Sequence, residues 1–391
     1  MEVTPRSAAV GGSATLALAA RAKALASEGR DVVNMAVGEP DFPAPAVARR
    51  AAAELLETGQ DIRYTPAAGT PALRKLLAEH MHATRGGDWS SEEVVVTHSC
   101  KHALSSTLSV LIREGQRVVL FEPVWSSYEA GIQIAGGEAV RLPARPDLGP
   151  NLEAFAALLA DRKLSAGIVG VMVCSPSNPS GYVWSREETE TLVALVERHD
   201  LWILSDEIYR GLVYEGEPAV SPASISDQGR ARTVVVDGAS KVFAMTGFRI
   251  GFAAGPKNVI DAIGRVQSET TGCPNALSQA AYAAALAGDP PEVEAMVREF
   301  DVRRRHLIAG LEAIGLPTPF PRGAFYAFSS IGEFPGGSTA FCEQLLEEEA
   351  VAIVPGKIFG MDAYVRFSYA ASMERIDAAL ERVGRFLAQR V

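Results

Sequence analysis

Short apolar runs alternate with amphipathic helical patterns through the middle of the chain, from residue 70 to about residue 255. Runs of this length that are rich in β-branched residues indicate buried strands. Five of them stand out, at residues 94–97, 118–121, 168–173, 201–204 and 233–236. Strand–helix alternation over this length predicts an α/β fold with a mostly parallel sheet and helices on both of its faces.

Two of the intervening helices show their starting points in the sequence. Ser185 and Glu188 have the spacing of a capping box ahead of an apolar helical face. Pro71 opens the other helix, with Thr70 as its N-cap. The helical period of this second segment predicts a buried face made of Leu73, Leu76 and Leu77.

The C-terminal third has a different pattern. A long helical stretch at residues 290–315 precedes short apolar runs around 325–329 and 351–354, and an amphipathic helix spans about 374–389. This order predicts a second, smaller α+β domain that also takes in the N-terminal arm. We expect the arm and part of the small domain at 1–42, the large domain at 43–285 and the small C-terminal domain at 286–391.

Composition narrows the class of protein. A net charge of −10 over 391 residues argues against a nucleic-acid partner, which needs a basic face. No apolar stretch reaches the roughly 18 residues of a membrane span, and the first thirty residues lack a signal-peptide pattern. We therefore expect a cytoplasmic enzyme with no membrane partner. The four cysteines and six histidines have no metal-binding spacing, so metal catalysis has no support.

Lys241 is the first candidate for chemistry. It follows an apolar strand and a Gly-Ala-Ser turn, and ligands of such sheets bind beyond the carboxyl ends of the strands. A partly desolvated lysine beside another cation has a lowered pKa and can act as a nucleophile and a base. We expect Arg249, eight residues on, to supply that positive charge and to pair with a phosphate. A surface lysine at a strand end is the alternative.

Six motifs follow one another along the chain. They are Gly38-Glu-Pro-Asp-Phe, Tyr64-Thr-Pro-Ala-Ala-Gly69, Ser175-Pro-Ser-Asn178-Pro-Ser-Gly181, Ser205-Asp206-Glu-Ile-Tyr209, Ser240-Lys241-Val-Phe-Ala-Met-Thr-Gly-Phe-Arg249-Ile-Gly and Val365-Arg366-Phe-Ser-Tyr-Ala. In this order they resemble the motifs of class I aminotransferases of fold type I, above all those of the bacterial aspartate/aromatic group. The similarity extends over nearly the whole chain.

The resemblance implies a pyridoxal-phosphate-dependent aminotransferase (EC 2.6.1.-). Its fold would be a seven-stranded, mostly parallel sheet between helices, with the smaller α+β domain beside it. Pyridoxal 5′-phosphate would be held by Lys241 as a Schiff base, an aldimine. The amino group of an L-amino acid, aspartate or glutamate or an aromatic one, would pass to a 2-oxo acid. The resemblance also implies a homodimer with shared active sites.

Each site residue takes its expected role from the same resemblance. Asp206 would pair with the protonated pyridine nitrogen, and Asn178 and Tyr209 would hydrogen-bond the phenolic oxygen of the ring. Trp125 would stack on one face of the ring and Ile208 would lie on the other. The remaining cofactor-binding residues would be Ser99, Cys100, Lys101, Ser240 and Arg249, with Tyr64 reaching over from the neighbouring subunit.

The substrate contacts are implied in the same way. Arg366 would bind the α-carboxylate bidentately, and it would share that group with the backbone of Gly38 and the side chain of Asn178. Lys101 and Thr15 match positions that grip a distal carboxylate in some bacterial relatives, which favours a dicarboxylic amino acid. Because Arg366 lies in an apolar run at 364–369, a structural salt bridge is its alternative role.

The chain departs from the family pattern at the phosphate turn. The usual Gly-Gly-Lys-Gln is replaced by Ser99-Cys100-Lys101-His102, preceded by His98. Residues that are bulkier than the glycines, which allow close backbone approach, suggest an altered entrance to the cofactor site. The two histidines could serve an unusual substrate or simply be satisfied polar residues. Cys174 and Phe248 also replace the usual asparagine and tryptophan.

Three other functions fit part of the pattern. The same fold and cofactor also support eliminations, replacements, cyclisations and racemisations. A regulator with an aminotransferase-like sensor domain would carry a basic DNA-binding extension, and this chain shows none. A nicotinamide dehydrogenase would carry a GxGxxG motif at the start of a helix, which is absent from the sequence.

Overall fold

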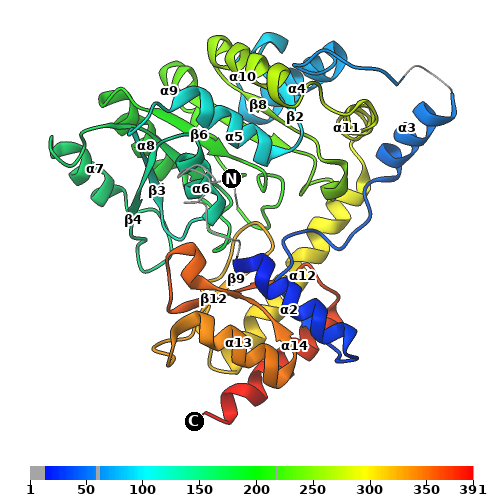
Figure 1. The fold of residues 1–391 in the computed structure, drawn as a ribbon, viewed down its shortest axis with the longest axis vertical. Coiled ribbons are helices and arrows are strands. Elements are labelled where there is room, and N and C mark those ends of the chain that lie inside the picture. The colour runs from blue at the N-terminus through cyan, green and yellow to red at the C-terminus, as the bar shows by residue number, and fades with distance from the viewer. Residues whose placement is uncertain (1–13, 59–61, 217, 391) are drawn as a thin grey trace, which may run out of the picture.

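The computed structural model describes residues 14–58, 62–216 and 218–390; within α2 (Ala14–Ser27), the side chains of residues 14–19 are not described. A large α/β domain lies at the top of Figure 1 and a smaller α+β domain lies below it. The long helix α12 (Pro291–Ala313) runs from one to the other (Figure 1). The expected arrangement is thus present, whereas the boundaries at 42/43 and 285/286 stay predictions.

The large domain is built on one seven-stranded sheet, in the order β2-β8-β7-β6-β5-β3-β4. Its strands are β2 (Val94–Thr97), β3 (Arg117–Phe121), β4 (Glu138–Leu142), β5 (Ile168–Cys174), β6 (Trp202–Asp206), β7 (Thr233–Gly238) and β8 (Gly251–Ala254). Strand β8 is antiparallel to both of its neighbours, and the other pairs are parallel. A mostly parallel sheet is therefore confirmed.

The five strands expected from the sequence are all present, but β4 and β8 were not predicted. Strand β4 lies at the edge of the sheet, and most of its residues are only half-buried. Its apolar pattern is therefore diluted by Glu138 and Arg141. Strand β8 is four residues long and contains Gly251 and two alanines, so it lacks the β-branched residues that indicate a strand.

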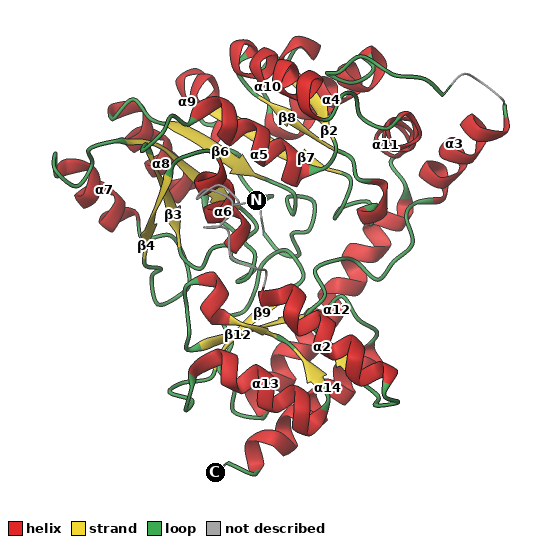
Figure 2. Cartoon of the chain, viewed as in Figure 1, coloured by secondary structure: helices red, strands yellow, loops and turns green. Residues whose placement is uncertain are grey.

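Helices cover both faces of this sheet (Figure 2). One face packs against α5 (Cys100–Leu111), α6 (Ser126–Ile134) and α10 (Lys257–Thr270). The other packs against α4 (Pro71–Arg85), α7 (Leu152–Ala160), α8 (Arg186–Arg198) and α11 (Ala276–Gly288). The remaining helices of this domain are α3 (Ala46–Glu57) and α9 (Asp227–Arg232).

Both expected helix caps are present. The Ser185 hydroxyl accepts a hydrogen bond from the backbone N–H of Glu188 at 3.1 Å, and the Glu188 carboxylate accepts one from the Ser185 backbone at 2.8 Å. The Thr70 hydroxyl caps α4 by accepting from the backbone N–H of Leu73. The predicted buried face of α4 is correct for two of its three leucines. The prediction for Leu76 was wrong, because this side chain is only half-buried.

The small domain combines a three-stranded antiparallel sheet with helices. Its strands are β9 (Tyr326–Ser330), β11 (Val354–Pro355) and β12 (Tyr364–Ser368), in the order β11-β12-β9. The helices are α2, α12, α13 (Gly337–Glu349) and α14 (Met373–Ala388). The N-terminal arm joins this domain as expected, because β1 (Val33–Asn34) pairs in parallel with β10 (Val351–Ala352). Among the described residues, no helix has both the length and the apolar character needed to cross a membrane.

Candidate active site

A cavity of about 550 Å³ lies where the two domains meet, beyond the carboxyl ends of β6 and β7. Thirteen of the residues predicted from the sequence line it, namely Gly38, Ser99, Cys100, Lys101, Trp125, Asn178, Asp206, Ile208, Tyr209, Ser240, Lys241, Arg249 and Arg366. Tyr64 does not line this cavity, and it is 98% exposed. Thr15 lies in α2, but its side chain is outside the described residues.

Lys241 has the environment expected of a reactive lysine. Its Nζ donates a hydrogen bond to the backbone carbonyl of Gly38, on the arm that joins the domains. The pKa of Lys241 is lowered to about 8, mainly by burial; the positive charge of Arg366 acts in the same direction, and Glu39 acts in the opposite one. The expected positive neighbour was Arg249, which lines the same cavity, but the cation among the main influences on this pKa is Arg366.

Asp206 is the last residue of β6 and is 3% exposed. Its Oδ2 accepts a hydrogen bond from the hydroxyl of Tyr128 at 2.7 Å, and its Oδ1 accepts one from the backbone N–H of Ile208 at 3.2 Å. Burial raises the pKa of Asp206 to about 6. The carboxylate is thus oriented but poorly solvated, and a cation in the cavity would stabilise its ionised form.

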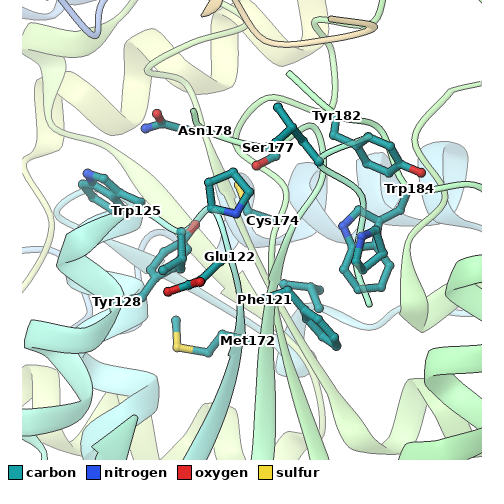
Figure 3. A pocket seen from close by; sticks show the side chains of 15 residues that line it. Phe121, Glu122, Trp125, Tyr128, Met172, Cys174, Ser177, Asn178, Tyr182 and Trp184 are labelled. Atoms are coloured by element: carbon teal, nitrogen blue, oxygen red, sulfur yellow. The ribbon is translucent and has the colours of Figure 1, made fainter. Parts of the chain in front are cut away.

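Two apolar side chains, Trp125 and Ile208, line the same cavity as Asp206. The Nζ of Lys101 lies 4.8 Å from the centroid of the Trp125 ring. Figure 3 shows the region behind Trp125, where Tyr128, Cys174 and other side chains surround a smaller cavity of about 30 Å³. The Trp125 and Tyr128 rings meet edge to face at 5.4 Å, so Tyr128 supports the position of the Trp125 ring.

The N-terminus of α5 forms one end of the cavity. Its N-cap, Ser99, makes no side-chain cap and has a φ of 126°, a conformation that normally favours glycine. A Cβ on Gly251 would lie 2.7 Å from the backbone nitrogen of Cys100, so the two segments pack closely. Uncapped N–H groups at a helix N-terminus bind anions, and Arg249 adds a guanidinium to the same cavity.

The two histidines of the altered turn lie outside this cavity. The rings of His98 and His102 meet edge to face at 5.5 Å. The Nε2 atom of His102 lies 3.5 Å from the hydroxyl of Thr271. These contacts give no support to a role in binding the substrate. Ser99 itself has the positive φ that normally favours glycine, in line with the glycine that the resemblance implies at this turn.

Arg366 is 5% exposed and lies in β12. Its Nη1 donates to the Oδ1 of Asn178 and its Nη2 to the carbonyl of Ala36, both at 2.9 Å. The guanidinium carbon lies 4.3 Å from the centroid of the Tyr326 ring. Among the described residues Arg366 makes no salt bridge, and its Nε has no hydrogen-bond partner. The alternative of a structural ion pair therefore has no support, and the buried charge lacks a counterion.

Several cavity residues were missed by the sequence reasoning. Tyr128 orients Asp206, and the hydroxyl of Tyr326 lies 2.9 Å from that of Tyr209. Glu39 accepts a hydrogen bond from the hydroxyl of Thr246 at 2.9 Å. Glu39 lies inside one of the six motifs and Tyr128 is three residues from Trp125. Their positions were therefore visible, but their contacts depend on segments that are distant in sequence.

Comparison with known proteins agrees with this geometry. The family model described as "Aminotransferase class I and II" matches residues 30–383. The chain belongs to this family. An aspartate aminotransferase of Thermotoga maritima is 38% identical over 380 residues, which is 97% of each chain. An aspartate/prephenate aminotransferase of Thermus thermophilus is 39% identical over 381 residues, 96% of each chain.

Solved structures give the same result. The aspartate aminotransferase of Thermus thermophilus with maleate has a TM-score of 0.93 at 37% identity, covering 98% of this chain and 99% of that one. The aspartate aminotransferase of Thermotoga maritima has a TM-score of 0.92 at 36% identity, covering 99% and 100%. The predicted fold is therefore confirmed. The protein is an aminotransferase, which moves an amino group from an amino acid to a 2-oxo acid, and enzymes of this family use pyridoxal phosphate.

Proposed function

We propose that this aminotransferase acts on a dicarboxylic L-amino acid of the aspartate or glutamate kind, with pyridoxal 5′-phosphate held at Lys241. The observation that carries the proposal is the buried guanidinium of Arg366, which faces the cavity without a counterion among the described residues. A carboxylate that pairs with it bidentately would supply the missing charge. The α-carboxylate of an amino acid has this geometry and charge.

The cavity also matches the cofactor group by group. The N-terminus of α5 and Arg249 would hold the phosphate, and Asp206 would pair with the pyridine nitrogen. Trp125 and Ile208 would enclose the ring, while Asn178, Tyr209, Ser240, Cys100 and Ser99 would supply polar and backbone contacts. When bound, pyridoxal phosphate supplies an electron sink for the bond that breaks at the α-carbon.

The residues of the chain would then divide the remaining tasks. Arg366 and Asn178 bind and orient the α-carboxylate, and the backbone of Gly38 closes the same side of the cavity. Lys241, with its pKa lowered to about 8, is neutral in about a tenth of the molecules at pH 7, and in this form it can move a proton at the α-carbon.

Lys101 supports the dicarboxylic substrate. Its Nζ lies over the Trp125 ring inside the cavity, and among the described residues it makes no ion pair. The cavity is lined by four cations, Lys101, Lys241, Arg249 and Arg366, and by two acids, Glu39 and Asp206. With Arg249 assigned to the phosphate and Arg366 to the α-carboxylate, Lys101 is available for a second carboxylate. The relative that was solved with maleate, a dicarboxylate, fits this assignment. Thr15 stays a proposed second contact.

We further propose a homodimer in which Tyr64 completes the site of the neighbouring subunit. The Tyr64 side chain projects from its own chain almost fully exposed, and the nearby Leu56 and Ile62 are exposed as well. Large apolar side chains that are exposed together are typical of an interface.

A half-reaction assay tests the proposal. L-aspartate, L-glutamate and L-phenylalanine would each be mixed with the loaded enzyme while the absorbance of the cofactor is followed. We expect rapid conversion to the aminated cofactor with the two acidic amino acids. In Lys101→Met we expect their kcat/KM to fall about 10- to 100-fold, with little change for phenylalanine. Equal losses for all three donors would contradict the role of Lys101, and no amination by any donor would contradict the proposal.

A further inference from the structure

A cluster of buried charges lies outside the active-site cavity, at the ends of the strands that carry its key residues. Its centre is Arg85, the last residue of α4, whose side chain is 1% exposed. The Nε of Arg85 donates to Glu207 at 2.9 Å, and its Nη2 donates to Asp237 at 2.5 Å. Glu207 and Asp237 do not line the cavity, so they have no direct part in binding the substrate.

The register of the sheet places these two acids side by side. Asp206 in β6 pairs in parallel with Val236 in β7. Because successive side chains of a strand point to opposite faces, Glu207 points away from the cavity into which Asp206 faces. Asp237 follows Val236 and points to the same far face. Two buried carboxylates therefore meet directly behind Asp206, and they need a cation between them.

The other polar contacts of the cluster balance its charge. The Oε1 of Glu207 accepts from the hydroxyls of Ser205 at 3.0 Å and Ser221 at 2.5 Å. The Nε of Arg210 lies 3.8 Å from the Oε2 of Glu207, so two cations face two acids. His80 lies near both guanidinium groups, and burial followed by their positive charges lowers its pKa to about 4, which keeps it neutral.

We infer that Arg85 is a positioning residue of the active site, because its single guanidinium joins the end of the strand that carries Asp206 to the segment that leads to Lys241. The guanidinium also balances the negative charges of Glu207 and Asp237, the acids beside Asp206. The inference rests on the proposed role of Asp206 toward the pyridine nitrogen. Tyr128 and the backbone of Ile208 stabilise ionised Asp206, whereas the charges of Asp237 and Glu207 disfavour it. Without Arg85 these two unbalanced charges would raise the pKa of Asp206.

The test is a titration of Asp206 in the cofactor-free protein. Infrared difference spectra follow the carboxyl group across pH, and the band that is lost in Asp206→Asn identifies it. In Arg85→Gln we expect the midpoint to rise from about 6 by about one pH unit or more. Arg85→Gln combined with Glu207→Gln restores the balance of charge and should return the midpoint to the wild-type value. Glu207→Gln alone, which keeps Arg85, should lower the midpoint of Asp206 below the wild-type value.

A matched control tests whether the effect comes from the position of Arg85 near Asp206 or from the loss of any buried arginine. Arg304 is also fully buried and pairs with two acids, Asp301 and Glu215, but these acids are not among the groups that shift the pKa of Asp206. Arg304→Gln should lower the Tm and leave the midpoint of Asp206 unchanged. A second readout is the affinity for pyridoxal phosphate, measured by tryptophan fluorescence, which we expect to fall about tenfold in Arg85→Gln and to recover in the double variant.

The outcomes distinguish the inference from the proposed function. Three outcomes of the titrations would overturn the inference. They are an unchanged Asp206 midpoint in both Arg85→Gln and Glu207→Gln, an equal shift of that midpoint in Arg304→Gln, and no return of the midpoint in the double variant. Each of these is measured without the cofactor. Failure of borohydride to trap pyridoxal phosphate on Lys241 of the wild-type protein would instead overturn the proposed function, and the titrations would still decide the role of Arg85.

Discussion

At the scale of single residues, the cavity sets the charge state of its lysine mainly by burial. The positive charge of Arg366 also lowers the pKa of Lys241, whereas Glu39 opposes the shift. A lysine with its usual pKa would be almost fully protonated at neutral pH, and it could neither attack an aldehyde nor accept a proton. The site therefore depends on a low dielectric environment as much as on the identity of the residue.

The pH dependence of cofactor attachment follows from this shift. Because the pKa of Lys241 is lowered to about 8, its neutral form accumulates as the pH rises to that value. We expect the rate at which cofactor-free protein takes up pyridoxal phosphate covalently to rise about tenfold per pH unit below 8 and then to level off. Stopped-flow absorbance measures it. In Arg366→Met the plateau should move to higher pH, and an unchanged curve would contradict the role of the arginine.

Arg366→Lys tests the carboxylate clamp. Lysine keeps the charge but cannot form two parallel hydrogen bonds to a carboxylate, nor can it lie flat on the Tyr326 ring. We expect kcat/KM to fall about 100-fold, mainly through KM. Steady-state kinetics with L-aspartate measure the change. A KM within about twofold of the wild-type value would show that the α-carboxylate binds elsewhere.

At the scale of elements, the anion site depends on how closely α5 packs against β8. The first turn of α5 supplies uncapped N–H groups, and Gly251 of β8 leaves the space in which Ser99 and Cys100 approach it. A side chain at Gly251 would meet the backbone of both residues at less than 3 Å. The backbone of Ser99 and Cys100 forms the start of α5, so it cannot move without moving the start of that helix.

Gly251→Ala should therefore weaken cofactor binding. The added methyl group displaces the start of α5, and we expect the Kd for pyridoxal phosphate to rise about tenfold or more. The matched control is Gly264→Ala in α10, where a Cβ meets nothing within 4 Å. There we expect normal affinity and a stability gain of about 0.5–1 kcal/mol from helix propensity. Equal affinities in the two variants would contradict the packing argument.

At the scale of the whole molecule, the site is assembled from both domains. Lys241 and Asp206 come from the large domain, whereas Arg366 lies in β12 of the small one and Gly38 lies on the connecting arm. Figure 1 shows the two domains and α12 running from one to the other. A substrate that contacts Arg366 and Lys241 at once therefore bridges the domains. The proposed dimer would add a third source of residues through Tyr64.

Mixed dimers test the shared site. Chains that carry Tyr64→Ala and chains that carry Lys241→Ala should each be nearly inactive alone. After unfolding and refolding in equal amounts, mixed dimers contain one intact site, so we expect about a quarter of the wild-type activity to return. Turnover with L-aspartate measures it, and the mass of the assembly is checked by light scattering. No recovery in a confirmed mixed dimer would contradict the contribution of Tyr64.

The sequence by itself determined the class of fold and most of the candidate site. Periodicity gave five of the seven strands, because strands that are buried on both faces are nearly continuous apolar runs. The six motifs located Lys241, Asp206 and Arg366, because each follows or lies within such a run. The sequence did not reveal β4, whose edge position leaves polar residues in the strand, or β8, whose residues are too small to form a pattern.

Only the tertiary structure decided how the site is charged and supported. Arg366 of the small domain acts on the pKa of Lys241, because both residues line the cavity where the domains meet. Tyr128 orients Asp206 from a helix, and Arg85 balances two acids that meet through the register of β6 and β7. These contacts join residues that are 78 to 152 positions apart. Local sequence patterns carry no information about such pairs, because the packing of whole elements creates them.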